Sequence, residues 1–268
     1  LNEFQPDFVF HLAAQALVRP SYNNPAETFS TNVQGSVNLL DAVRQCQSVR
    51  SLVYITSDKC YENVEWIWGY RENDQLGGRD PYSASKAAAE IVFSSYSRSF
   101  FDHRPLLGAA TTRAGNVIGG GDVSKDRLLV DLLAAYREGQ SPIIRFPSAV
   151  RPWQHVLDCL NGYLALADAL LAGNGQGEWN FGPGRESFVS VGEVADLAAE
   201  VWGGGSSWTK TTDPQPHEAE LLALDASKAL SELNWTNELP YPLSLEWTVQ
   251  WQKLVDGGLS PREAALQQ

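Results

Sequence analysis

Residues 8–56 read FVFHLAAQALVRPSYNNPAETFSTNVQGSVNLLDAVRQCQSVRSLVYIT and contain one complete strand–helix–strand unit. The apolar run at 8–12 predicts a buried strand, and the run at 51–56 predicts the next one. Between them, Asn24-Pro25 is typical of a helix start, and apolar residues recur at helical spacing over 29–43. This alternation predicts an α/β fold built on a doubly wound parallel sheet.

Further β-rich and helical stretches alternate along the rest of the chain, which indicates a large domain and a smaller lobe. Residues 1–115 are expected to form the sheet domain. Residues 116–268 are expected to form mainly a mixed α/β lobe, with segments at about 145–180 returning to the sheet. The polar stretch at 60–81 is too long for an ordinary connection and indicates a functional loop. The other expected elements are a helix at 82–101, a strand at 106–112, a helix at 126–138, a strand at 143–144 and a helix at 155–171.

The composition excludes several classes of protein. A formal net charge of -12 disfavours a general nucleic-acid surface, because phosphate binding requires clustered lysine and arginine. No apolar run approaches the roughly 20 residues that cross a bilayer. The three cysteines are odd in number and far apart, which indicates no disulfide framework, no metal site and a reducing cytoplasm. The chain also lacks methionine, as expected of a fragment.

Two short motifs carry candidate chemistry. Tyr82 and Lys86 are spaced by four at an expected helix start, so both side chains would share one helical face. On such a face an ammonium group favours the ionised phenol, which then works as a general acid or base. Ser57, Asp58 and Lys59 follow a strand, at the edge where open α/β sheets bind ligands. The alternatives are a surface helix pair for the first motif and a solvated polar turn for the second.

Together these motifs resemble the short-chain dehydrogenase/reductases, whose Ser/Thr-Tyr-Lys triad is matched by Ser57, Tyr82 and Lys86. HLAAQ at 11–15 and the later Asn32 resemble the extended branch of that superfamily, the NAD-dependent epimerases and dehydratases. Lysine directly after the acid is similar to the CDP-glucose 4,6-dehydratases, because most related dehydratases carry glutamate there. Other segments that resemble this family are TSDKCYEN at 56–63, GYRENDQLGGRDPYSASK at 69–86, RAGNVIGGGD at 113–122, RPWQHVL at 151–157 and His217-Glu218 leading to Leu224-Asp225.

The resemblance implies a Rossmann-type fold with a smaller substrate-binding lobe. Such a fold carries a glycine-rich phosphate loop at its first strand-to-helix turn, and none precedes Phe8. About 60 to 90 residues, including the first strands, are therefore expected to be missing. The resemblance further implies an NAD cofactor and a hydro-lyase that converts CDP-glucose to CDP-4-keto-6-deoxyglucose.

The resemblance also implies a role for each candidate residue. Tyr82 would remove the 4-hydroxyl proton while hydride leaves C4 for NAD, and Lys86 would hold the nicotinamide ribose. Lys59 would then take the C5 proton as Asp58 protonates the departing 6-hydroxyl. The resemblance assigns cofactor binding to Ala13, Ala14, Gln15, Asn32, Thr56, Tyr82 and Lys86, and substrate binding to Ser57, Asn116, Arg127 and Arg151.

Two other interpretations stay open at this point. A nucleotide-sugar 4-epimerase shares the triad and the cofactor but needs no acid–base pair, whereas a truncated piece would be non-catalytic. A homodimer through the helices near 25–45 and 82–100 and a part in deoxysugar supply for surface polysaccharide are implied by the resemblance. Trp66 and Trp68 are interpreted as packing anchors, with a lid or an interface as the alternative, and His155 is given no catalytic role.

Overall fold

The computed structural model describes residues 1, 3–211 and 221–268. His217 and Glu218, which belong to the family resemblance, lie outside this described part. The chain divides into two compact units. The first consists of Leu1–Gly115, Leu160–Gly182 and Ala223–Thr236, and the second of Asn116–Cys159, Pro183–Leu222 and Asn237–Gln268.

The first unit is built on one parallel sheet with the strand order β1-β2-β3-β8. In register, Phe8 pairs with Ser51 and Ser51 with Gly108. Parallel neighbours require a crossover, usually a helix, which explains the alternation in the sequence. The predicted parallel sheet is therefore confirmed. The strands are β1 (Phe8–His11), β2 (Ser51–Ile55), β3 (Gly108–Arg113) and β8 (Gly177–Asn180).

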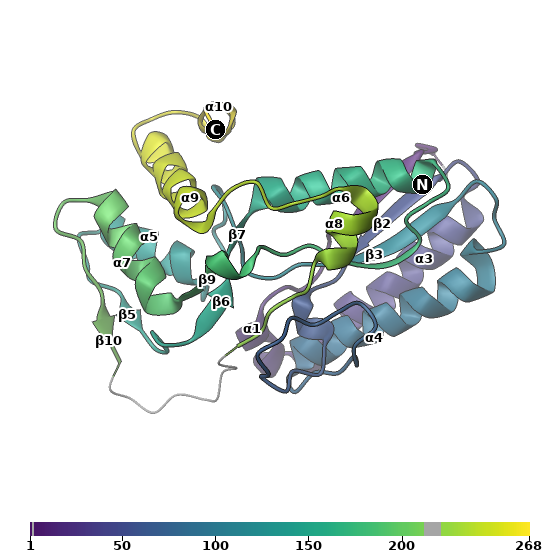
Figure 1. The fold of residues 1–268 in the computed structure, drawn as a ribbon, viewed down its shortest axis with the longest axis horizontal. Helices are drawn as coiled ribbons and strands as arrows, with labels where there is room; N and C mark the ends of the chain where they lie inside the picture. Colours follow the sequence, from purple (N-terminus) through teal and green to yellow (C-terminus); the bar gives the residue numbers. More distant parts are fainter. Residues whose placement is uncertain (2, 212–220) are drawn as a thin grey trace. The chain divides into compact units, whose positions relative to one another are not determined.

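Helices cover both faces of this sheet (Figure 1). On one face α3 and α4 bury Leu40, Val43 and Phe93 against Leu52 and Ala109 of the strands. On the other face lies α6, whose Ala167 carbonyl accepts a hydrogen bond from the Ser51 hydroxyl. The helices are α1 (Val18–Asn23), α2 (Pro25–Phe29), α3 (Gly35–Gln45), α4 (Pro81–Tyr96), α6 (Val156–Leu171) and α8 (Ser227–Leu233), with π-helical turns η1 (Ser30–Gln34) and η3 (Ser97–Phe101).

Helix starts differ in detail from the sequence prediction. The helix expected after Asn24 does begin at Pro25, but the Asn24 side chain makes no capping hydrogen bond. A side-chain cap is present on another helix, α4. There the Asp80 carboxylate accepts hydrogen bonds from the Ser83 backbone N–H at 2.9 Å and from the Ser83 hydroxyl at 2.6 Å. This cap fixes the first turn of the helix that carries the Tyr-Lys motif.

The second unit is a small mixed α/β body with its own core. Leu132 and Leu133 of one helix pack with Val194, Leu245 and Val249 of two others. Its helices are α5 (Leu128–Arg137), α7 (Val191–Trp202), α9 (Tyr241–Asp256) and α10 (Pro261–Leu266). Its strand pairs are β4 (Val117–Ile118) with β7 (Gln154–His155), β5 (Ile143–Ile144) with β10 (Thr209–Lys210), and β6 (Val150–Pro152) with β9 (Phe188–Ser190).

The boundaries of the two observed units differ in part from those of the predicted domains. The first change of unit falls between Gly115 and Asn116, where the sequence placed the boundary. The segment that returns to the first unit covers 160–182 rather than about 145–180, and a further return at 223–236 was not predicted. The loop predicted at 60–81 is irregular apart from isolated bridges, and it follows a short 3₁₀ turn, η2 (Asp58–Cys60). No helix in the described residues is long and apolar enough to span a membrane.

Candidate functional site

The start of α4 places the predicted tyrosine and lysine on its buried face. Tyr82 and Lys86 are each only 6% exposed. A spacing of four residues aligns them along one side of the helix, as the sequence predicted. The alternative of a surface helix pair is therefore wrong. The Tyr82 backbone is fixed further by its N–H, which donates to the Ser21 hydroxyl at 3.2 Å.

The ammonium group of Lys86 is strongly affected by its burial in this helix face. Burial lowers the pKa of Lys86 to about 8, although the negative charge of Glu90 acts in the opposite direction. Among the described residues, none accepts a hydrogen bond from its ammonium group. A buried ammonium that lacks an acceptor suits a ligand that brings hydroxyl oxygens, such as a ribose.

The second motif forms a tight turn at the end of β2. The Ser57 hydroxyl donates to Asp58 Oδ1 at 3.0 Å and accepts from the Lys59 backbone N–H at 3.2 Å. The Asp58 N–H donates to the Ala114 carbonyl at 3.1 Å, which holds the turn beside the end of β3. Asp58 is only 3% exposed, so the alternative of a fully solvated turn is wrong, whereas Lys59 is half-buried. The turn packs against α4, which brings the two motifs together.

The loop after β1 is joined to α4 through Asn32. The Asn32 side-chain oxygen accepts from the Gln15 N–H at 2.8 Å, and its amide donates to the Gln15 carbonyl and to the Ser85 hydroxyl, both at 2.9 Å. Ser85 in turn donates to the Tyr82 carbonyl at 2.7 Å. Burial and the positive charge of Lys86 lower the pKa of His11, the last residue of β1 before this loop. Asn32 thus fixes the predicted cofactor loop on the helix of the Tyr-Lys motif.

The other predicted cofactor residues fall into two groups. Ala13 and Ala14 lie in the same loop, which follows the carboxyl end of β1, and a methyl side chain takes up little space there. The Thr56 hydroxyl instead points inward and donates to Glu90, and the Thr112 carbonyl lies 3.1 Å from the same hydroxyl oxygen. The Thr56 side chain is therefore hydrogen-bonded inside the first unit.

Three of the predicted substrate residues, Asn116, Arg127 and Arg151, lie in the second unit. Asn116 precedes β4 with a φ of 49°, a left-handed conformation that few side chains adopt, and its carbonyl accepts from the Gln154 N–H. Arg151 on β6 is buried rather than in a surface salt bridge, and one of its guanidinium N–H groups donates to the Val150 carbonyl. Arg127 precedes α5 and forms a partly exposed ion pair with Asp122 at 3.2 Å.

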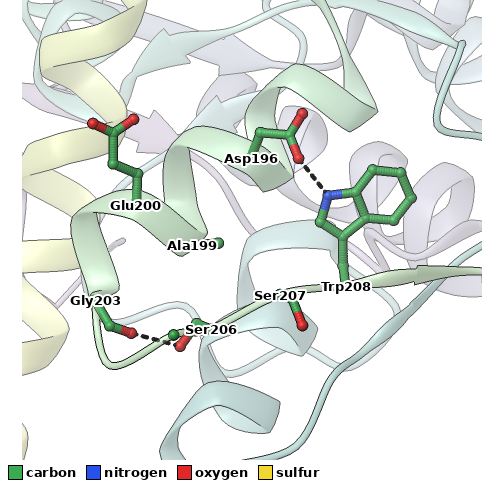
Figure 2. A pocket seen from close by; sticks show the side chains of 8 residues that line it. Asp196, Ala199, Glu200, Gly203, Ser206, Ser207 and Trp208 are labelled. Carbon is green, nitrogen blue, oxygen red and sulfur yellow. Dashed lines mark hydrogen bonds between the residues drawn. The ribbon is translucent and has the colours of Figure 1, made fainter.

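A cavity in the second unit holds none of the predicted residues. Figure 2 shows the Trp208 indole N–H directed at Asp196, to which it donates at 2.7 Å. Glu200 lies on the same helix, and a glycine-rich turn with Ser206 and Ser207 closes the other side. No lysine or arginine lies among the described residues that line it. A cavity with two carboxylates and no cation does not suit a diphosphate.

Sequence reasoning missed an ionic network behind the turn. Glu90 and Arg113 form a buried ion pair, and Tyr61 hydrogen-bonds Arg113. One signal was available, because Glu90 follows Lys86 by four residues and so lies on the same helical face. In the long loop, Trp66 packs on Tyr70 at 5.3 Å between ring centroids, as a packing anchor would, whereas Trp68 is exposed. His155 is the last residue before α6, and its side chain is buried, as that of a core residue would be.

Comparison with known proteins places this arrangement in a family. The model of the NAD dependent epimerase/dehydratase family matches residues 1–182. The chain belongs to this family. It is 48% identical over 259 residues to CDP-glucose 4,6-dehydratase of Salmonella typhimurium, and the match covers 94% of this chain and 72% of that protein.

Solved structures of other members share the fold. UDP-glucose 4-epimerase of Thermus thermophilus in complex with NAD aligns with a TM-score of 0.81 at 26% identity, covering 96% of this chain and 80% of that one. A dTDP-glucose 4,6-dehydratase of Streptomyces venezuelae aligns with a TM-score of 0.81 at 24% identity, covering 95% of this chain and 76% of that one. The first unit is thus a Rossmann-type fold, and NAD is the cofactor of the family to which the chain belongs. The Lys86 ammonium and the small residues after β1 fit such a cofactor.

Proposed function

We propose that this member of the family is a nucleotide-sugar 4,6-dehydratase that converts CDP-glucose to CDP-4-keto-6-deoxyglucose. The observation that carries the proposal is the 48% identity over 94% of the chain to the Salmonella enzyme of that activity. The acidic and basic side chains at Asp58 and Lys59 support it, because elimination of water needs one group to give a proton and another to take one.

Four residues of the two motifs have a task in proton transfer or cofactor binding, and the fifth, Ser57, is proposed to bind the substrate. Lys86 and the loop after β1 would hold NAD, which when bound would supply reversible hydride transfer between C4 and C6 of the hexose. Tyr82 removes the 4-hydroxyl proton, and Lys86 holds the ribose next to the phenol. The 4-ketone that results makes the C5 proton acidic, and Lys59 takes this proton while Asp58 gives one to the departing 6-hydroxyl.

The protons balance over the whole cycle. Lys59 returns its proton to C5 when the double bond is reduced, and water carries away the proton that Asp58 gave. The proton taken by Tyr82 replaces that of Asp58 through solvent. In the second unit, Asn116, Arg127 and Arg151 are proposed to bind the substrate, with the guanidinium groups directed to its diphosphate.

The test is turnover of CDP-glucose by the protein purified from its complete reading frame and supplied with NAD. Formation of a 4-keto-6-deoxy sugar, detected by its absorbance in alkali, is expected, and Tyr82→Phe and Lys59→Ala are expected to abolish it. Turnover of another nucleotide sugar alone would overturn the cytidine assignment. An epimerised hexose with no loss of water would move the chain to the 4-epimerases.

The protein is further proposed to be a cytoplasmic homodimer that supplies deoxysugars for surface polysaccharide. Apolar side chains are exposed on the helices of one face of the sheet, namely Phe29 before η1, Ile91 on α4 and Phe100 on η3. Sedimentation equilibrium is expected to give twice the chain mass for the wild type and a single chain for Ile91→Asp. Leu230→Asp, which changes an exposed leucine on α8, is the control and is expected to leave the dimer intact.

A further inference from the structure

The turn that carries Asp58 and Lys59 is bounded by two residues, Thr56 and Tyr61, that contact the same buried ion pair. The Thr56 hydroxyl donates to Glu90. The Tyr61 hydroxyl accepts from Arg113 Nη1 at 2.7 Å, and the guanidinium lies 4.8 Å from the centre of the Tyr61 ring. Both ends of the turn are therefore attached to one ionic group.

The ion pair itself has little freedom to move. Arg113 Nε and Nη2 donate to the two carboxylate oxygens of Glu90, each at 2.9 Å, and both side chains are only 2% exposed. Two parallel bonds between planar groups fix orientation as well as distance. The Thr111 hydroxyl, from inside β3, donates to the same carboxylate at 2.9 Å.

Tyr61 is held from its other side as well. Its hydroxyl donates to Asn180 Oδ1 on β8 at 2.8 Å, and the Asn180 amide donates to the Tyr70 carbonyl at 2.8 Å. Burial strongly raises the pKa of Tyr61, more than the nearby Arg113 lowers it. The hydroxyl therefore keeps its proton and can accept from Arg113 while it donates to Asn180.

Glu90 connects this attachment to the helix of the Tyr-Lys motif. Tyr82, Lys86 and Glu90 recur every four residues on the buried face of α4. Any shift of the ion pair relative to α4 would thus move the turn relative to Tyr82 and Lys86. Those two residues, by contrast, are positioned by α4 itself and do not depend on Tyr61.

We propose that the Glu90–Arg113 pair is a clamp on the Ser57–Cys60 turn, and that Tyr61 is the positioning residue through which it aligns Asp58 and Lys59 for elimination. This inference rests on the proposed function. In the step concerned, Lys59 takes the C5 proton, the electron pair of that bond forms the C5–C6 double bond, the C6–O bond breaks, and the proton of Asp58 leaves with the 6-hydroxyl as water. The earlier oxidation at C4, in which bound NAD would accept the hydride and Tyr82 the proton, does not use the clamp.

The variant that tests the clamp is Tyr61→Phe, which keeps the ring and removes only the hydroxyl. Thr111→Val is the matched control, because it removes a hydrogen bond to the same carboxylate at a residue that does not bound the turn. Tyr61→Phe loses two buried hydrogen bonds, with Arg113 and with Asn180, and Thr111→Val loses one, so a loss of stability of about 1–3 kcal/mol per bond is expected. Both rate constants are compared on protein that is still folded, so slowing of the second step alone would report position rather than stability.

A single turnover of CDP-glucose, stopped by rapid quench and followed by mass spectrometry, separates the two steps. The 4-ketohexose is two hydrogens lighter than the substrate, and the product is lighter by one water. In Tyr61→Phe we expect the 4-ketohexose to form within about two-fold of the wild-type rate and to decay on the order of ten-fold more slowly. In Thr111→Val both rate constants should match the wild type.

A second readout uses the protein without substrate. Amide hydrogen exchange at Asp58 and Cys60 is expected to be faster in Tyr61→Phe and unchanged in Thr111→Val. Wild-type decay of the 4-ketohexose in Tyr61→Phe, or equal slowing of both steps, would overturn the clamp while leaving the proposed function intact. Absence of any turnover by the wild type would overturn the proposed function, and the clamp with it, before a variant is compared.

Discussion

Lys86 and Glu90 lie one helical turn apart on the buried face of α4, yet they differ in their hydrogen-bond partners within the described residues. The Glu90 carboxylate accepts hydrogen bonds from Arg113, Thr56 and Thr111. The Lys86 ammonium donates to no group within the described residues. One buried charge is thus fully satisfied by the protein, and the other fits a partner that arrives with a ligand. The two residues are expected to respond to mutation in opposite ways.

Replacement of Arg113 by methionine is expected to destabilise the fold strongly. The change leaves the Glu90 carboxylate buried without its charge partner, and breaking such a pair typically costs about 3–5 kcal/mol. Urea unfolding followed by fluorescence measures the loss. Arg137→Met is the control, because the Arg137–Asp256 pair is largely exposed and is expected to contribute less than about 1 kcal/mol. Equal losses in the two variants would contradict the importance of the buried pair.

Replacement of Lys86 by methionine is expected to raise stability at pH 7 while it abolishes turnover. Burial lowers the pKa of Lys86 from 10.5 to about 8, so the folded protein disfavours its charged form. Below pH 8 the charge is present in both states and the whole penalty applies, which at about 1.4 kcal/mol per pKa unit is roughly 3 kcal/mol. Methionine has a similar length and carries no charge.

The stability difference between Lys86→Met and the wild type is expected to depend on pH. Between about pH 8 and 10.5 the unfolded chain binds more protons at this lysine than the folded one, so wild-type stability rises with pH there. The advantage of Lys86→Met should therefore shrink from pH 7 to pH 10 in urea unfolding. Asn38→Ala, which changes an exposed side chain that carries no charge, should show no such pH-dependent gain. A Lys86→Met protein less stable than the wild type at pH 7 would refute the argument.

The elements that sequence could predict are those that depend on local pattern. The buried strand β2, the parallel sheet and the alignment of Tyr82 with Lys86 follow from apolar periodicity and from spacing along a helix. The π-helical turn η1 was not predicted, because its sequence fits an ordinary helix. It contains Asn32, whose partners lie 17 and 53 residues away.

The Glu90–Arg113 clamp could not be predicted from local sequence pattern, for the same reason. Glu90 and Arg113 are 23 residues apart, and Tyr61 is 52 residues from Arg113, so only the assembled sheet brings them together. The family resemblance included the segment that begins at Arg113, but it did not indicate that Glu90 is the partner of Arg113. The family resemblance assigned Thr56 to the cofactor, whereas the structure directs its hydroxyl to Glu90.

Replacement of Asn32 by alanine is expected to loosen the loop after β1. The change leaves the Gln15 N–H and carbonyl and the Ser85 hydroxyl without a shared partner, at a cost of about 1–3 kcal/mol. Calorimetry is expected to show weaker NAD binding together with the loss of stability. Asn38→Ala removes an exposed hydrogen bond with Gln34 and should change stability by less than about 0.5 kcal/mol. Unchanged NAD affinity in Asn32→Ala would separate this loop from the cofactor.

Replacement of Gly115 by alanine is expected to displace the Asp58 carboxylate. A Cβ atom at Gly115 would lie 1.9 Å from Asp58 Oδ2 and 2.4 Å from Asp58 Cγ, far inside van der Waals contact. Asp58 is buried and bonded to Ser57, so its short side chain can move only by giving up that position. Because small misplacements of a reacting group lower rates steeply, kcat for dehydration should fall on the order of ten-fold or more, with KM little changed.

The added methyl group needs a control at a glycine where space is available. At Gly35 the nearest atom to a new Cβ is 4.0 Å away, and alanine in a helix is favoured over glycine by about 0.5–1 kcal/mol. Gly35→Ala should therefore be slightly stabilised and keep the wild-type kcat. In the rapid-quench experiment Gly115→Ala should accumulate the 4-ketohexose, because Tyr82 and Lys86 are untouched. A Gly115→Ala enzyme that forms product at the wild-type rate would show that Asp58 does not protonate the departing 6-hydroxyl from the position observed.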